Sequence, residues 1–413
     1  MSPVTPADTE TTRTPPYSGQ PGAAEHGRAA DLRQDLQVLY SAPPLVMDTE
    51  VSRLRRRLGE AAARKAFVFA AANGLPAGNP MSAQSVQSHL EIILAFSAIV
   101  MYETGLRVVR VASTDGEGGA VQERTLSDRY RSEVGVLNFV RGCSSGGQAD
   151  LRNVRHWSPE FIRESPSGLR YDLTVDAIER ALSFFDACRM GADEGSLFSS
   201  EFYVSHQATD PDYEQGMTRR SRSDADWFDT STHMLWVDAG ELAEHRFPEH
   251  LITGINNPVG TVFDSRSDPE ILIRFVEAVS AGDPHGRLAI AVAAEDDAEG
   301  EKIAALARRI SDLGCTPVWM CDAVPQVSGI AAPVAFGRVH QRFLATEAAL
   351  ESAGIALSGI RMPLTHEDVD ECIGGTWLSG SGRSPAILPK APRLNARQVI
   401  DLAYLIADHL KTR

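Results

Sequence analysis

The chain has 413 residues, of which 43% are hydrophobic and 23% are charged, and its formal net charge is −15. That length and hydrophobic fraction suffice to bury one large core, while the acidic excess and the lack of an evident Lys/Arg cluster disfavour nucleic acid and anionic membranes as partners. The five cysteines are an odd number without paired C-x-x-C spacing, which predicts reduced thiols and a cytoplasmic location.

The N-terminal segment differs in composition from the rest of the chain. Residues 1–30 are rich in Pro, Thr, Gly and Ala, which predicts a disordered tail ahead of one domain spanning residues 31–413. No basic stretch followed by an apolar one marks a targeting signal, and no run approaches the roughly 18 uninterrupted apolar residues of a membrane helix. Helical patterns then dominate the first half, notably at 86–102 and 173–188.

The second half alternates between helix and strand patterns. A helix capped by Asp268 is expected first, followed by a buried strand in the apolar run 288–294. An amphipathic helix then continues to Leu313 and stops at Gly314, and another strand is expected at 317–321. Strand, helix and strand in succession indicate a parallel α/β fold.

Six strings in the sequence carry a resemblance to a known family. They are SEFYVSHQ from Ser200, DWFDTSTHMLW from Asp226, NNPVG from Asn256, VWMCD from Val318, DVDECIGG from Asp368 and APRLNARQVIDLAYLIADHL from Ala391. The chain resembles class II 3-deoxy-D-arabino-heptulosonate-7-phosphate (DAHP) synthases from about Ala42 to its C-terminus. The resemblance implies a (β/α)₈ barrel with additional N-terminal and inserted helices. It also implies an ancestry in the condensation of phosphoenolpyruvate with erythrose 4-phosphate, which uses a divalent metal.

The resemblance also places the family's metal ligands, and here none of those positions carries a donor side chain. The family's cysteine after the first strand corresponds to Gly74, and its histidine, glutamate and aspartate correspond to Pro325, Pro363 and Ala391. We therefore expect no metal ion and no other cofactor. We expect these four positions to converge at one mouth of the barrel, where the active sites of such barrels lie.

Positions that bind phosphate in the family have changed in the same direction. Arginines of the family correspond to Ser113, Gly240, Leu242 and Ala293, and a lysine corresponds to Val262. Arg and Lys bind oxyanions through forked hydrogen bonds and point charge, so their loss removes the means of holding two phosphorylated substrates. Apart from Leu242, these positions are expected to line the wall beside the mouth.

Acidic side chains instead follow the predicted strand ends, namely Asp115, Glu117, Asp238, Glu241, Asp264, Glu295 and Asp296. Without compensating Lys or Arg they would repel phosphorylated substrates, so the expected ligand is a neutral, apolar or cationic small molecule. Taken alone, each carboxylate is better interpreted as an ordinary solvated loop residue; the coordinated loss of the cations is the stronger observation. The candidate substrate pocket comprises Ser113, Asp115, Gly240, Val262, Asp264, Ala293, Glu295, Gln326, Arg361 and His366.

Four residues are candidates for proton transfer. His233 and His206 match family positions near the pocket and, with Glu201 and Asp322, could supply a general acid or base. For each histidine, a structural role in a buried hydrogen-bond network is an equal alternative. The sequence alone does not choose between these roles.

Lys390, beside the vacated position Ala391, is a candidate for covalent chemistry. A lysine desolvated at a strand end could form a Schiff base with a carbonyl substrate and so replace activation by a metal. The alternative is an ordinary surface lysine. Cys321, in a strand-like run, is predicted to be a small core residue rather than a nucleophile.

Three functions therefore compete. The first is a barrel repurposed in specialised metabolism for a metal-independent aldol-type, cyclising or eliminating reaction on a substrate that is not doubly phosphorylated. The second is a non-catalytic pseudoenzyme or regulatory partner of a shikimate-pathway enzyme, and homo-oligomers are expected because family members form them. The third is ordinary DAHP synthesis with a rebuilt site. The vacated ligand positions argue most strongly against the third, and the orderly strand ends weakly favour the first.

Overall fold

The structure is a computed structural model that describes residues 26–73, 75, 82–115, 125–157, 166–188, 201–221, 226–243, 247–264, 268–280, 285–325, 333–375 and 392–411. Four predicted site positions lie outside the described residues: Gly74, Gln326, Lys390 and Ala391. Residues 1–25 of the predicted tail also lie outside them. Helix α1 (His26–Ser41) begins the described chain, so the tail boundary predicted at residue 30 falls inside a helix.

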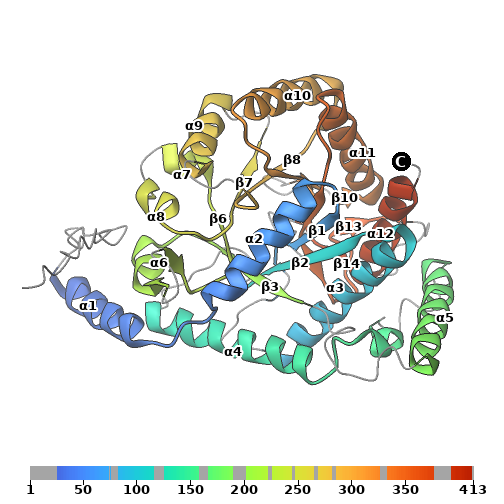
Figure 1. The fold of residues 1–413 in the computed structure, drawn as a ribbon, viewed down its shortest axis with the longest axis horizontal. Coiled ribbons are helices and arrows are strands. Elements are labelled where there is room, and N and C mark those ends of the chain that lie inside the picture. Colours follow the sequence, from blue (N-terminus) through green and yellow to red (C-terminus); the bar gives the residue numbers. More distant parts are fainter. Residues whose placement is uncertain are drawn as a thin grey trace, which may run out of the picture.

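Eight parallel strands close into a barrel in the order β1-β11-β9-β8-β7-β6-β3-β2 (Figure 1). Their bounds are β1 (Ala66–Ala71), β2 (Arg107–Ser113), β3 (Tyr203–Gln207), β6 (Met234–Trp236), β7 (Val259–Phe263), β8 (Leu288–Val292), β9 (Val318–Asp322) and β11 (Gly359–Met362). This confirms the predicted (β/α)₈ barrel. The strands expected at 288–294 and 317–321 are β8 and β9.

Helices surround the barrel (Figure 1). They are α2 (Asp48–Ala62), α3 (Ala83–Thr104), α4 (Leu126–Ser145), α5 (Pro166–Ala187), α6 (Pro211–Met217), α7 (Ala239–Ala243), α8 (Glu249–Thr253), α9 (Pro269–Ser280), α10 (Asp297–Asp312), α11 (Phe336–Ser352) and α12 (Ala396–Lys411), with the 3₁₀ helix η2 at Leu151–His156. Short strands pair outside the barrel: β4 (Thr218–Arg220) with β5 (Trp227–Asp229), β10 (Val334–Ala335) with β13 (Cys372–Ile373), and β12 (Leu364–Thr365) with β14 (Leu394–Asn395).

Helix termini in the second half follow the sequence signals. The side chain of Asp268 accepts the backbone N–H of Glu270 at 3.0 Å and so caps the start of α9, as predicted. Gly314 follows the end of α10 with φ 76°, a left-handed conformation that glycine adopts without steric cost. The helix patterns at 86–102 and 173–188 correspond to α3 and α5, which are longer than predicted.

The barrel interior is filled by side chains from alternate strand positions, as pleated strands require. Its buried cluster consists of Ala66, Val68, Ala70, Val109, Val111, Tyr203, Met234, Trp236, Ala289, Ala291, Val318 and Met320, together with three residues of α2, Leu54, Leu58 and Ala61. Helix α2 therefore closes the amino-terminal end of the barrel, and in Figure 1 it lies across the ring of strands. The carboxyl ends of the strands form the opposite end, which we call the mouth.

Helix α3 is long and apolar enough, by length and composition, to cross a membrane. In the structure, 67% of its most apolar window is buried inside the protein, and it packs against α12, α4 and the barrel strands. Buried core helices commonly pass such a test. We therefore regard α3 as the central helix of the outer core, between the barrel and the surrounding helices.

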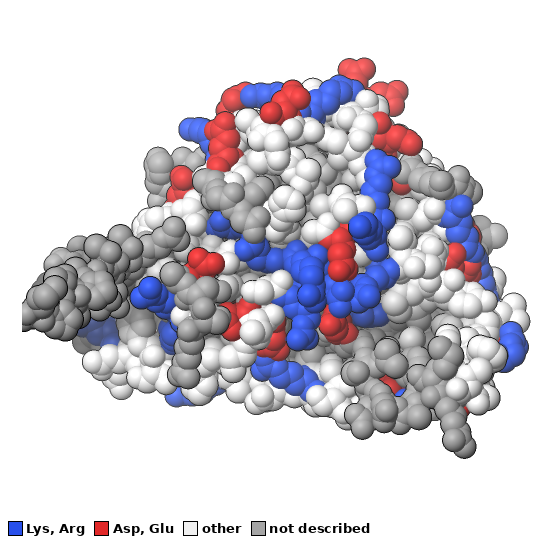
Figure 2. Space-filling model, in the orientation of Figure 1, with Lys and Arg blue, Asp and Glu red and all other residues white. Residues whose placement is uncertain are grey.

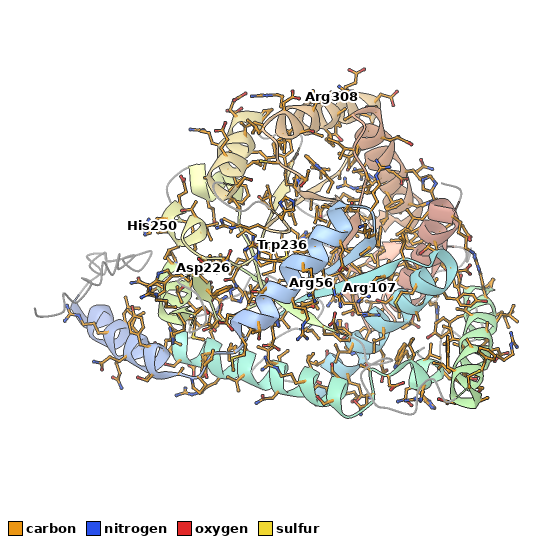
Figure 3. All side chains as sticks on the ribbon, in the orientation of Figure 1. Arg56, Arg107, Asp226, Trp236, His250 and Arg308 are labelled. Carbon is orange, nitrogen blue, oxygen red and sulfur yellow. The ribbon has the colours of Figure 1, made fainter. Side chains whose placement is uncertain are left out.

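Basic side chains gather on the amino-terminal face, over α2 (Figure 2). Arg53, Arg56 and Arg107 are exposed there, and Figure 3 places Arg56 and Arg107 close to each other. This corrects the expectation of a chain without a Lys/Arg cluster, although the string RLRRR at 53–57 already signalled it. The case against polyanionic partners therefore rests on the net charge of −15 alone.

Candidate active site

The mouth of the barrel is lined by the inward-facing residues at the strand ends. Because side chains alternate along a strand, Ser113 faces inward two positions beyond the lumen residue Val111, and the same parity applies to the other strands. The inward-facing positions described at the mouth include Ser113, Gln207, Trp236, Val262, Ala293, Asp322 and Arg361. Three of the four predicted wall positions are therefore among them. Gly240 is the exception, because it lies in α7.

Asp322, Arg361 and Trp236 meet inside the mouth. Nη1 of Arg361 donates a hydrogen bond to Oδ1 of Asp322 at 2.8 Å, and β9 and β11, which carry the two residues, are neighbours. The Arg361 guanidinium lies over the Trp236 ring, 5.0 Å from its centroid. Since β6 and β11 are four strands apart in a ring of eight, this contact crosses the lumen. Asp322 and Arg361 are among the candidates predicted from the sequence, whereas Trp236 is not, although its place in the string STHMLW gave a signal.

Asp115 joins the ends of β2 and β3. Its Oδ2 accepts hydrogen bonds from Oγ of Ser113 at 2.6 Å and from the backbone N–H of Gln207 at 2.9 Å. The backbone N–H of Asp115 in turn donates to Oγ of Ser113 at 3.1 Å. The carboxylate of Asp115 thus accepts hydrogen bonds from β2 and β3 and links the ends of these two strands.

Other acidic residues near the mouth are also engaged by neighbours. Glu295 forms ion pairs with Arg338 and Arg342. The side chain of Asp296 caps α10, and that of Asp238 accepts a backbone N–H of α7 at 2.7 Å. These contacts correct the expectation of an uncompensated negative mouth, because cations and helix N-termini already balance the carboxylates. The prediction that the mouth repels any anion loses its physical basis.

The remaining acidic candidates are not inward-facing strand residues. Glu241 is partly buried in α7, beside Gly240, and Asp264 is exposed directly after β7. Glu117 lies outside the described residues.

Two of the four positions that correspond to metal ligands are described. Pro325 and Pro363 are buried and follow the neighbouring strands β9 and β11. The carbonyl of Pro363 accepts the backbone N–H of Leu394 at 3.1 Å, so the PRLN segment returns to this end of the barrel. Gly74 and Ala391 lie outside the described residues, and the convergence of all four positions stays a prediction.

The described side chains do not fit the metal that the family resemblance implies. Cys321 faces outward, where its thiol contacts Oγ1 of Thr346 at 3.8 Å and burial raises its pKa to about 12. Asp322 is held by Arg361. Over the described parts of the chain, no three His, Cys, Asp or Glu side chains are grouped so that they could hold a metal ion.

His233 and Glu201 lie at the amino-terminal end of the barrel, opposite the mouth, because they precede β6 and β3. Nδ1 of His233 accepts the backbone N–H of Val204 at 3.0 Å, and burial lowers the pKa of His233 to about 4. Glu201 pairs with Arg57 of α2 at 3.2 Å. Both residues were predicted as acid–base candidates, and their position corrects that prediction: they hold the closed end of the barrel.

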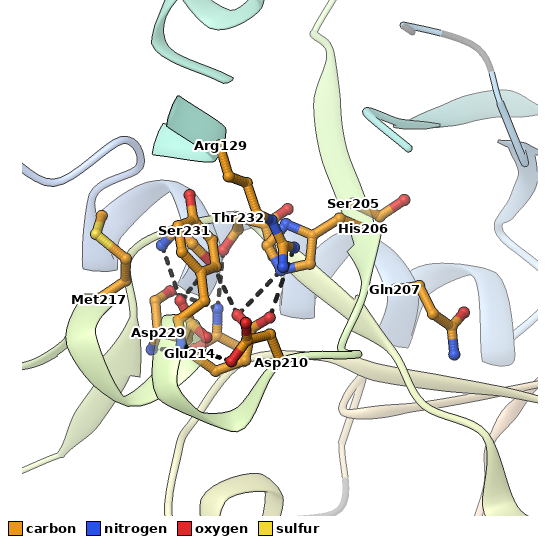
Figure 4. Close-up of polar contacts among 12 residues, drawn as sticks. Arg129, Ser205, His206, Gln207, Asp210, Glu214, Met217, Asp229, Ser231 and Thr232 are labelled. Atoms are coloured by element: carbon orange, nitrogen blue, oxygen red, sulfur yellow. Dashed lines mark hydrogen bonds and ion pairs between the residues drawn. The ribbon is translucent and has the colours of Figure 1, made fainter. Parts of the chain in front are cut away.

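His206 lies on β3 but faces outward. Figure 4 shows Ser205 and Gln207 pointing away from its ring, which belongs to a buried cluster between β3, α4 and α6. Nε2 of His206 lies 3.0 Å from Oε2 of Glu214, and Nδ1 lies 3.5 Å from Oε1 of Glu133. His206 is therefore part of a structural network, the alternative left open by the sequence, and does not reach the mouth.

Charges in this cluster shift one another's pKa values. Burial lowers the pKa of His206, but the carboxylates of Glu214 and Glu133 outweigh it and raise the value to about 9. Burial raises the pKa of Glu214, and the positive charges of His206 and Arg129 overcome it and lower the value to about 2. Burial and the Glu214 charge raise the pKa of Asp229 well above its usual range, so Asp229 stays protonated and can donate to Glu214.

His366 follows β12 directly. The next segment, DVDECIGG, is bonded to the PRLN segment. The His366 ring meets His89 of α3 edge-on, with the ring centroids 4.9 Å apart, and burial lowers its pKa. The backbone N–H and Nε of Arg393 donate to the carboxylate of Glu371 at 2.8 and 3.0 Å, which joins the strings DVDECIGG and PRLN. His366 is thus near the strand ends but not at an inward-facing strand position.

The fold and this arrangement agree with comparison to known proteins. A sequence model of the Class-II DAHP synthetase family matches residues 9–118 and 115–407. Because these matches cover nearly the whole sequence, the chain belongs to the class II DAHP synthase family.

Two related proteins share most of its length. The phospho-2-dehydro-3-deoxyheptonate aldolase of Streptomyces coelicolor is 28% identical over 449 aligned residues, covering 98% of this chain and 98% of that protein. The phospho-2-dehydro-3-deoxyheptonate aldolase AroG of Mycolicibacterium smegmatis is 26% identical over 419 aligned residues, covering 91% and 89%. A truncated 3-deoxy-D-arabino-heptulosonate 7-phosphate synthase from Thermotoga maritima matches with a TM-score of 0.36 and 11% identity over 84% of this chain and 87% of that one. That similarity is too low to add to the argument, and the strand order alone establishes the barrel.

Proposed function

We propose that this class II DAHP synthase-family barrel has been repurposed, in specialised metabolism, for a metal-independent reaction on a substrate that is not doubly phosphorylated. The reaction class is aldol-type, cyclising or eliminating. The observation that carries the proposal is the chemistry of the inward-facing strand ends. Ser113, Val262 and Ala293 are short and neutral where the resemblance implies arginine or lysine. Side chains of this kind cannot hold two phosphate groups.

The residues left for chemistry at the mouth are few. Asp322 is an inward-facing carboxylate held by Arg361 at 2.8 Å, and carboxylates are among the side chains that act as general acids or bases. Ser113 and Gln207 add polar groups on the opposite rim. Lys390 lies outside the described residues, so a Schiff base at that position stays a prediction. If Lys390 formed this Schiff base, it would activate the carbonyl group of the substrate covalently.

Conversion of phosphoenolpyruvate and erythrose 4-phosphate tests the proposal. The purified protein is assayed with and without Mn²⁺, beside the S. coelicolor relative as a positive control, and the metal content of each sample is measured. We expect turnover by the relative and none by this chain. Turnover that depends on bound metal would overturn the proposal and return the chain to DAHP synthesis.

Ordinary DAHP synthesis is the second candidate, and similarity to two phospho-2-dehydro-3-deoxyheptonate aldolases along nearly the whole chain favours it. The neutral side chains of Ser113, Val262 and Ala293 argue against it, because DAHP synthesis requires two phosphorylated substrates to be bound. A non-catalytic partner of a shikimate-pathway enzyme is the third, and it would bind that enzyme without converting any substrate of its own. We further infer homo-oligomers, because the family resemblance implies them. A cytoplasmic location is inferred from the cysteines, which are all free thiols and all buried except Cys188.

A further inference from the structure

Arg361 has hydrogen-bond donors at the mouth that no described protein group accepts. Its guanidinium lies in the lumen, held by one hydrogen bond to Asp322 and by the face of Trp236, which comes from the opposite side of the barrel. These two contacts fix the plane of the group before any ligand arrives. Only 19% of the Arg361 side chain is exposed, so water satisfies little of it.

The donors of Arg361 are only partly used. An arginine carries five N–H donors, and Asp322 takes one of them, on Nη1. Nε is buried and makes no hydrogen bond. The edge formed by Nε and Nη2 is therefore uncommitted, and this edge matches the two oxygens of a carboxylate in a forked arrangement.

The surroundings favour a single negative charge on the ligand. Arg361 is the one Lys or Arg among the inward-facing positions described at the mouth, and Asp322 already balances part of its charge. One guanidinium balances the single negative charge of a carboxylate but leaves a phosphate dianion with excess negative charge. The carboxylates of Asp115 and Glu295 are held by other partners and do not compete for Arg361.

Part of the wall is apolar. The Trp236 ring, Val262, Ala291 and Ala293 line the lumen beside the guanidinium. Such a wall suits the hydrocarbon body of a ligand, while Arg361 fixes its orientation.

We propose that the mouth binds a monocarboxylate with an apolar body, its carboxylate on the Nε and Nη2 edge of Arg361 and its body against Trp236. This inference rests on the proposed function, because it identifies the substrate class of the same site. It replaces the expectation of a neutral or cationic ligand. Phosphorylation of the substrate is not required for binding.

Benzoate is the probe that tests the proposal, with benzamide as its uncharged counterpart. Titration calorimetry on the full-length protein should show saturable one-to-one binding of benzoate, and benzamide should bind about tenfold more weakly or worse, because it lacks the charge that pairs with Arg361. The proposal is wrong if benzamide binds as well as benzoate. It is also wrong if benzoate does not bind up to its solubility limit.

Variants locate the site. Arg361→Met should lower benzoate affinity by about tenfold or more, while Arg56→Met, which removes an exposed arginine from the opposite end of the barrel, should not change it. Arg361→Lys keeps the charge but loses the fork and should bind benzoate several-fold more weakly than the parent. It also serves if Arg361→Met fails to fold, as judged by circular dichroism. Unchanged benzoate affinity in the folded Arg361 variants overturns the proposal.

The two proposals fail separately. A protein that makes DAHP but still binds benzoate through Arg361 contradicts the proposed function alone. A protein that makes no DAHP and binds benzoate independently of Arg361 contradicts only the assignment of the substrate class.

Discussion

Two regions of this protein use ionisable side chains in opposite ways. At the mouth, the guanidinium of Arg361 and the carboxylate of Asp322 face a lumen whose other described inward-facing positions carry no charge, and part of the guanidinium has no partner. Outside the barrel, ion pairs link Arg129, Glu133, His206 and Glu214 in a buried cluster that also contains Asp229; Figure 4 shows Arg129, His206, Glu214 and Asp229. The cluster contains the side chains that look catalytic by type, yet it holds α4 and α6 against β3. Position in the barrel, rather than residue type, therefore marks the site.

The largest effect is expected from breaking the buried cluster. Arg129→Met should destabilise the protein by about 3–5 kcal/mol, because it leaves the buried carboxylates of Glu133 and Glu214 with only one cation, His206, in place of two. Urea unfolding of the parent and variant measures the change. The matched control is Arg131→Met on the same helix, where the arginine is 70% exposed and a loss below about 1 kcal/mol is expected. Equal losses in the two variants would show that the cluster does not stabilise the fold.

The cluster also predicts how stability depends on pH. The folded pKa of His206 is raised from 6.5 to about 9, so its contribution is full below about pH 6.5 and is lost as pH rises through 9. The raised pKa of Asp229 acts in the same direction. The folded pKa of Glu214 is lowered from 4.5 to about 2, so its contribution is present above about pH 4.5 and is lost as pH falls toward 2.

Unfolding midpoints in urea, measured from pH 6 to 9.5, check the alkaline limb. A shift of this size corresponds to about 3 kcal/mol for a single group. The variant His206→Gln should show a flatter profile over that range than the parent. A parent profile that is already flat, or an equal slope in the variant, would mean that His206 is not held as an imidazolium.

The sequence predicted the scaffold better than the site, and particular residues show why. The helix that ends at Gly314 and the strands β8 and β9 follow from local patterns that tertiary contacts do not override. His206 was assigned near the pocket, but a shift of one residue along a strand moves a side chain to the other face, and no pattern in the short strand β3 fixes which face is inward. Family resemblance gave the barrel and the positions Ser113, Val262 and Ala293.

The sequence could not predict which charged side chains pair with each other. The pairing of Glu295 with Arg338 and Arg342 joins residues more than 40 positions apart, and that of Arg361 with Asp322 joins two different strands. Counting acidic residues near strand ends therefore overestimated the negative potential of the mouth. An aromatic wall formed by Trp236 across the lumen likewise depends on barrel closure, which only the fold provides.

A smaller loss of stability is expected from a substitution at the amino-terminal end of the barrel, opposite the mouth. His233→Leu removes the acceptor of the buried Val204 N–H, which should cost about 1–3 kcal/mol of stability. Because His233 lies at the end opposite the mouth, benzoate affinity should stay unchanged. Thermal unfolding and titration of the same sample measure both quantities. A loss of benzoate binding in a folded variant would restore His233 as a site residue.

The smallest effect, and the sharpest test of the mouth, is expected for Asp322→Asn. The change keeps the shape of the side chain and its place beside Arg361, but it removes the negative charge that competes with a ligand carboxylate. Benzoate should therefore bind a few-fold more tightly, while stability should change by about 1 kcal/mol, since the pair is only partly buried. Calorimetry with benzoate and benzamide separates the effect of the ligand charge from that of space in the mouth, because only the charged ligand should gain affinity.

An equal gain for benzamide would mean that the substitution merely opens the mouth. A weaker affinity for benzoate would mean that Asp322 is needed to hold Arg361 in place. Only a gain confined to benzoate makes Asp322 and the ligand carboxylate competitors for one guanidinium.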